Sequence, residues 1–181
     1  MIIGITGTSG AGKGTVAEYL VRDHGFKHYS VRAFLNEELA RRGISSDRDA
    51  LISVANDLRA RYGPGYISET IMGEALAAKS DAVIESIRSI GEAQYLRARG
   101  ARLWAVDADI ELRYTRITSR LSETDRVLFE KFRAEEEQEY VNEDVTKQNL
   151  RAVIALADVL LYNDSSTQEL FAKVEEALNA Q

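Results

Sequence analysis

The chain has 181 residues, no cysteine, two histidines and a formal net charge of −6. Its length suits a single domain with a sizeable core, while its composition excludes disulfides, thiolate metal sites and zinc clusters. The acidic balance argues against a broad nucleic-acid surface, which needs clustered Lys and Arg. No apolar run approaches the roughly 20 residues that span a bilayer, so we expect a cytoplasmic protein outside the membrane, with its oligomeric state left open.

Short apolar runs alternate with longer segments of helical period along the chain. The apolar runs predict strands at 2–6, 27–30, 82–85, 103–107 and 159–162. The helical period predicts helices at 13–23, 33–42, 48–62, 66–79 and 168–180. Apolar runs separated by helices indicate a parallel sheet covered by helices on each side. Helical stretches at about 31–80 and 109–157 interrupt this alternation.

A glycine-rich segment follows the first predicted strand and opens the first predicted helix. Its sequence from residue 7 to residue 15, GTSGAGKGT, matches the pattern G-x-x-x-x-G-K. Glycines let backbone N–H groups approach phosphate oxygens, and the start of the helix adds partial positive charge. Lys13 can reach the β- and γ-phosphates of ATP and offset charge during transfer. The expected ATP-binding residues of this segment are Gly7, Ser9, Gly10, Ala11, Gly12, Lys13, Gly14 and Thr15.

The residue after the lysine is usually Ser or Thr and ligates Mg²⁺, whereas here it is Gly14, followed by Thr15. This Gly-Lys-Gly-Thr variant resembles adenylate kinase and its nucleoside monophosphate kinase relatives. The resemblance implies that Mg²⁺ is held mostly by phosphate oxygens and waters, with help from Thr15.

Polar residues at the ends of the second and third strands extend the resemblance. Ser30-Val31-Arg32 stands where monophosphate kinases place a Ser and then an Arg-bearing helix that faces the acceptor phosphate. The segment 84–88, IESIR, is similar to the Asp-Gly-Phe-Pro-Arg segment of adenylate kinase. It implies that Glu85 orders Mg²⁺-bound water, that Arg88 binds the acceptor phosphate and that Glu92 lies near the acceptor base. Arg59 lies in the helical insert, where an exposed arginine is an equal alternative to a ligand. The expected acceptor-binding residues are Ser30, Arg32, Arg59, Arg88 and Glu92.

Arg113, Arg116 and Arg120 recur at i, i+3 and i+7, which places them on one helix face. Arginines that close over the γ-phosphate would screen its charge and exclude water, and a helix face paired with nearby Glu residues is the plainer alternative. We expect the acidic run 135–137, together with Glu139, to be a solvated helix face rather than a metal site. The expected catalytic residues are Lys13, Arg88, Arg116 and Arg120.

The tail from Ala157 to Leu170 resembles the last strand and helix of dephospho-coenzyme A kinase, and an adenine could rest against its turn at Asn163. Taken together, these resemblances cover nearly the whole chain. They imply one P-loop α/β domain over residues 1–181 with strand order 2-3-1-4-5. The acceptor-binding insert would lie at about 31–80 and a lid at about 112–135.

The function that we expect is transfer of the ATP γ-phosphate to a small-molecule acceptor, a nucleoside or deoxynucleoside monophosphate. Dephospho-coenzyme A kinase is disfavoured because its hydroxyl acceptor needs an activating carboxylate, and the segment 29–32 contains no Asp. A switch GTPase is disfavoured because the nearest guanine-reading motif, TKQN at 146–149, lacks its Asp. A nucleotide-binding ATPase coupled to a protein partner stays open, and the base and sugar of the acceptor are not identified.

Overall fold

The computed structural model describes residues 1–119, 128–140, 142, 144 and 147–180. Its elements are, in chain order, β1 (Ile2–Gly7), α1 (Lys13–His24), β2 (Lys27–Ser30), α2 (Val31–Arg41), α3 (Arg48–Tyr62), α4 (Tyr66–Ala77), β3 (Ala82–Glu85), α5 (Ile90–Ala98), β4 (Arg102–Asp107), α6 (Ile110–Thr118), α7 (Phe129–Tyr140), α8 (Leu150–Ala155), β5 (Val159–Tyr162) and α9 (Thr167–Asn179). The five predicted strands are confirmed to within one residue at each end. No helix among the described residues is long and apolar enough to cross a membrane.

The five strands form one parallel sheet in the order β2-β3-β1-β4-β5, as predicted. Because all strands run in one direction, their carboxyl ends meet at a single edge of the sheet. Ser30 lies opposite Glu85 in the register of β2 and β3, and Gly7 lies opposite Val106 of β4. This edge therefore brings together the ends of segments that are far apart in the sequence.

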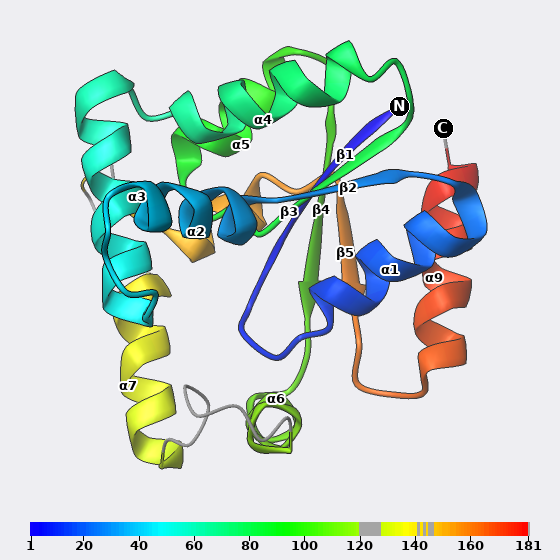
Figure 1. Cartoon of the computed structure of the whole chain (residues 1–181). Helices are drawn as coiled ribbons and strands as arrows, with labels where there is room; N and C mark the ends of the chain where they lie inside the picture. The colour runs from blue at the N-terminus through cyan, green and yellow to red at the C-terminus, as the bar shows by residue number, and fades with distance from the viewer. Residues whose placement is uncertain (120–127, 141, 143, 145–146, 181) are drawn as a thin grey trace.

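Helices cover both faces of the sheet, so the sheet separates two apolar cores (Figure 1). Ile5 of β1 and Trp104 of β4 are fully buried on the face covered by α1 and α9. Ile84 and Leu103 are fully buried on the other face, together with Leu96 of α5. Neighbouring residues of each strand point to opposite faces, which is why the strands appear in the sequence as continuous apolar runs.

Polar side chains fix where two of the helices begin. Helix α2 starts at Val31, two residues before the predicted start, because the Ser30 hydroxyl accepts a hydrogen bond of 3.3 Å from the Ala33 amide. Helix α5 is not among the predicted helices. It begins with a capping box in which Ser89 and Glu92 each bind the other's backbone amide. These caps place the segment that carries Arg88 at the start of α5.

A buried ion pair between Arg59 of α3 and Glu92 of α5 ties the helical insert to the core. Arg59 donates from Nε and Nη2 to Glu92 Oε1 at 3.2 and 3.1 Å, and from Nη1 to Asn56 Oδ1 at 3.3 Å. The two side chains are only 1% and 0% exposed. The other carboxylate oxygen of Glu92 accepts the amides of Arg88 and Ser89 at 3.4 and 3.2 Å. Glu92 therefore connects α3 to the turn that follows β3.

We expect Arg59→Met to destabilise the protein by about 3–5 kcal/mol, because it leaves the buried Glu92 carboxylate without its cation. The double variant Arg59→Met/Glu92→Met should lose less, since no buried charge remains. Arg61→Met is the matched control, because Arg61 lies on the same helix with 64% of its side chain exposed. Urea unfolding measures all three, and an Arg59→Met protein as stable as the control would contradict the expectation.

Candidate active site

The glycine-rich loop connects β1 to α1 at the carboxyl edge of the sheet (Figure 1). Gly7, Gly10 and Gly12 have φ angles of 134°, 80° and 102°, which side-chain-bearing residues rarely adopt. A Cβ atom at Gly7 would lie 1.9 Å from the Val106 carbonyl oxygen, and one at Gly10 would lie 2.6 Å from that of Arg113. The loop backbone thus packs directly on β4 and α6, which requires glycine at both positions.

Two side chains from the far half of the sheet hold carbonyl groups of the loop. Arg113 of α6 donates from Nη1 to the Ser9 carbonyl at 3.3 Å. Asn163, just after β5, donates from Nδ2 to the Ala11 carbonyl at 2.8 Å. Both carbonyl oxygens therefore face protein donors, which keeps them from facing an anion bound in the loop.

The amide groups of the loop are arranged in the opposite way. Within the residues that the structure describes, the backbone N–H groups of Ser9, Gly10 and Gly12 have no protein acceptor. Lys13 is 9% exposed, and its Nζ donates to the Gly7 and Thr8 carbonyls at 3.0 and 2.8 Å. Unpaired amides beside a lysine at the start of a helix form a site suited to phosphate.

Asp107 and Arg113 form a polar network beside the loop. Asp107 Oδ1 accepts the Thr8 hydroxyl at 2.5 Å and the Ala108 amide at 2.9 Å. Arg113 is buried, donates from Nε to the Ala108 carbonyl at 2.7 Å and forms a two-pronged ion pair with Glu136 of α7. Sequence reasoning missed Asp107, although a carboxylate at the carboxyl end of a strand is itself a signal for this edge.

The acidic run at residues 135–137 is not the solvated helix face that the sequence indicates. Glu136 pairs with the buried Arg113, and Glu135 pairs with Arg48 at the start of α3. Among the described side chains of this face, only Glu137 matches the expectation, with 70% of its side chain exposed and Arg133 of its own helix as a partner; the Glu139 side chain lies outside those described. Local spacing does not reveal such pairings between distant segments.

The predicted arginine face is divided by the structure. Arg113 supports the loop, as described above, whereas Arg116 donates from Nη2 to the Asn163 carbonyl at 2.8 Å. Arg116 Nη1 is buried and has no hydrogen-bond partner in the described part of the chain. Arg120 lies outside the described residues, as does most of the lid segment between α6 and α7.

Glu85 at the end of β3 lies 3.0 Å from His28 Nε2 through its Oε2 atom. Burial acts to raise the pKa of Glu85. The hydrogen bond to His28 and the positive charges of Lys13 and His28 outweigh burial, so the pKa lies below its ordinary value. Ser86 follows with a φ of 76°, a strained angle for a residue with a side chain. Because its pKa lies below the ordinary value, Glu85 is an ionised carboxylate at neutral pH.

The predicted acceptor residues separate into two groups. Ser30, Arg32 and Arg88 lie at or just beyond the carboxyl ends of β2 and β3. Arg32 is exposed and has no hydrogen bond or ion pair to any residue that the structure describes, while Arg88 donates to Gln148 Oε1 at 3.4 Å. Arg59 and Glu92 instead pair with each other in the interior, with the groups that would read an acceptor already engaged.

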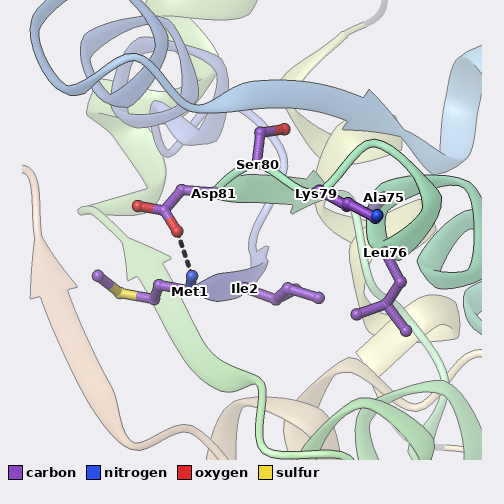
Figure 2. A pocket seen from close by; sticks show the side chains of 7 residues that line it. All are labelled: Met1, Ile2, Ala75, Leu76, Lys79, Ser80 and Asp81. Carbon is purple, nitrogen blue, oxygen red and sulfur yellow. Dashed lines mark hydrogen bonds and ion pairs between the residues drawn. The ribbon is translucent and has the colours of Figure 1, made fainter.

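A cavity of about 220 Å³ lies at the opposite edge of the sheet (Figure 2). It is lined by residues that precede or begin β1 and β3, among them Met1, Ile2 and Asp81, and the Met1 amino group pairs with the Asp81 carboxylate (Figure 2). Because ligands of such sheets bind at the carboxyl ends of the strands, we do not assign this cavity to the site.

The loop glycines give a matched pair of stability variants. Gly7→Ala should cost about 3 kcal/mol or more, because it combines an unfavourable φ with a clash against backbone. Gly14→Ala should leave stability unchanged or raise it by up to about 1 kcal/mol, because alanine favours helix and a Cβ there meets no atom of the described residues within 4 Å. Urea unfolding midpoints measure both, and equal losses would contradict the geometry.

Comparisons with known proteins agree with this architecture. Residues 3–142 match the family model described as AAA domain. The chain is 30% identical to the UPF0200 protein of Hyperthermus butylicus, with 99% of this chain and 94% of that protein covered. It is 29% identical to the UPF0200 protein of Sulfurisphaera tokodaii, with 98% and 95% covered.

Two solved structures share the fold. TT1252 from Thermus thermophilus superposes with a TM-score of 0.65 at 22% identity, covering 99% of this chain and 96% of that one. Shikimate kinase from Aquifex aeolicus superposes with a TM-score of 0.58 at 17% identity, covering 99% and 97%. The chain therefore belongs to the AAA domain family, as a relative of the UPF0200 proteins, and has a P-loop kinase-like fold.

Proposed function

We propose that the protein is a phosphotransferase that moves the γ-phosphate of ATP to the phosphate of a nucleoside or deoxynucleoside monophosphate. The observation that carries this proposal is the loop, whose Ser9, Gly10 and Gly12 amides lack protein acceptors in the described structure. These amides and the adjacent Lys13 would bind the phosphates of ATP. On binding, Lys13 would exchange the Gly7 and Thr8 carbonyls for phosphate oxygens.

The donors near the loop fit Mg²⁺ as the metal of the reaction. Among the described residues no cluster of three or more His, Asp or Glu could hold a metal by itself. Mg²⁺ needs no such cluster, since it keeps several waters and binds one or two protein oxygens together with substrate phosphates. Thr15 and the ionised Glu85 would hold it, Glu85 through water. Bound Mg²⁺ would supply neutralisation of the charge on the phosphate oxygens.

Arginines would supply the remaining positive charge. We assign Arg116 and Arg120 to the transferring phosphate, as their spacing along one helix face suggests. The buried Nη1 of Arg116, which lacks a partner in the described structure, supports this role. Asn163 would contribute to the ATP site by holding the Ala11 carbonyl away from the phosphates.

Two arginines just beyond the carboxyl ends of β2 and β3 favour a phosphate as the acceptor. Arg32 and Arg88 would bind the acceptor phosphate, because two guanidinium groups match a dianionic monoester in charge and geometry. Ser30 would line the same pocket. Arg59 and Glu92 would act from behind it, through the backbone of Arg88.

We expect Lys13→Ala to lower the rate of transfer on the order of 10²-fold or more, because it removes a contact that offsets charge in the transition state. Lys79→Ala is the control, since Lys79 lines the cavity at the opposite edge. The assay follows labelled phosphate from ATP to nucleoside monophosphates, and circular dichroism verifies folding. A folded Lys13→Ala protein with wild-type turnover would contradict the proposal.

We expect Arg32→Ala and Arg88→Ala to raise the acceptor KM while leaving ATP affinity nearly unchanged, because the loop holds ATP. Arg99→Ala serves as the control, since Arg99 stacks on Tyr95 at the far end of α5. The acceptors to compare are nucleoside monophosphates, their nucleosides and dephospho-coenzyme A. Transfer to dephospho-coenzyme A alone would replace the proposed acceptor, and ATP hydrolysis indifferent to every acceptor would indicate the partner-coupled ATPase.

A further inference from the structure

Three consecutive glutamates of α7 face three different environments. Glu135 pairs with Arg48 of the acceptor insert, Glu136 pairs with Arg113 beside the loop, and Glu137 faces solvent. Figure 1 shows α7 at the lower left, next to the start of α3 and to one side of the sheet edge that carries the loop. One helix therefore contacts both halves of the proposed site.

The Arg113 guanidinium is held in one plane by its partners. Nη2 donates to Glu136 Oε2 at 3.0 Å, Nη1 donates to Glu136 Oε1, and Nε donates to the Ala108 carbonyl at 2.7 Å. The Arg113 side chain is 6% exposed, so water does not compete for these donors. Because the guanidinium is planar and is bound on its Nη side by Glu136 and on its Nε side by Ala108, it has little freedom to rotate. Glu136 thus determines where the remaining bond of Nη1, to the Ser9 carbonyl, is directed.

The peptide unit between Ser9 and Gly10 is the part of the loop that this bond controls. Gly10 has a φ of 80°, in a region where glycine moves readily between conformations. Without the Arg113 bond this peptide can turn, which would direct the Ser9 carbonyl oxygen toward the phosphate and the Gly10 amide away from it. A carbonyl in that position repels an anion that the amide would attract.

We propose that Glu136 is a positioning residue for ATP, which it serves by holding Arg113 on the Ser9 carbonyl. The proposal rests on the proposed function for the identity of the ligand. Glu135 holds the acceptor insert in the same way, through its ion pair with Arg48. Helix α7 would thus fix the position of the loop relative to the insert.

The three glutamates allow one substitution to be tested in three settings, as Glu135→Gln, Glu136→Gln and Glu137→Gln. Glu136→Gln keeps the shape of the side chain and does not strand Arg113, because Asp107 Oδ1 lies 3.8 Å from its Nε. Glu136→Asp is a second variant that retains the charge but shortens the reach. Thermal unfolding establishes that each protein is folded.

The first measurement needs no ligand. In ¹⁵N–¹H correlation spectra the Gly10 amide reports on the Ser9 carbonyl, since both belong to one peptide unit. Glu136→Gln and Glu136→Asp should shift or broaden the Gly10 and Arg113 Nε resonances, whereas Glu137→Gln should leave them in place. Unchanged resonances in both Glu136 variants would overturn the proposal.

The second measurement is MgATP affinity by calorimetry, with KM values for ATP and acceptor alongside. Glu136→Gln should weaken ATP binding about tenfold, which corresponds to about 1.4 kcal/mol, with the acceptor KM little changed. Glu135→Gln should raise the acceptor KM and spare ATP. Wild-type ATP affinity in Glu136→Gln would overturn the positioning role alone, whereas a wild-type protein that binds no ATP would overturn the proposed function itself.

Discussion

A loop that wraps a phosphate must point its amides at the anion and its carbonyl oxygens elsewhere, and the site depends on how the chain meets this requirement. The loop cannot do so alone, because its glycines leave the backbone free to turn. The carbonyls of Ser9 and Ala11 are held by Arg113 and Asn163, which lie 104 and 152 residues further along the chain. The sheet order β1-β4-β5 makes this possible by placing the ends of β4 and β5 beside the loop.

Two buried arginine–glutamate pairs organise the two sides of the site. Arg113–Glu136 lies beside the loop, and Arg59–Glu92 lies behind the segment that carries Arg88. Burying a charge pair costs about as much free energy as the attraction returns, so neither pair is an efficient source of stability. Their contribution is orientation, because a guanidinium fork and a carboxylate accept few relative arrangements. Each pair fixes a backbone segment that we propose contacts substrate.

The sequence predicts the sheet and the position of the glycine-rich loop well because both leave local signals. Five apolar runs separated by helices define the strands, and the glycine spacing before Lys13 defines the loop. Helix α5 escapes prediction because its main local signal is a single capping box, Ser89 to Glu92. The roles of Arg113, Glu136 and Arg59 could not be predicted, since each depends on a partner from a distant segment. An arginine that binds phosphate and one that pairs with a buried glutamate have the same local sequence pattern.

The open space beside Gly14 separates two reasons for glycine in a phosphate-binding loop, the packing of the protein itself and the space needed by the ligand. At Gly7 and Gly12 the protein itself excludes a side chain, since a Cβ would meet Val106 or Asn163. At Gly14 no atom of the described residues lies within 4 Å of a Cβ, so a side chain there would meet open space at the start of α1, where we propose that the phosphates bind. In a library of functional variants, the residues accepted at position 7 would be limited by the stability of the fold. Those accepted at position 14 would be limited by the ligand, and they would give a direct measure of the space that the bound nucleotide leaves.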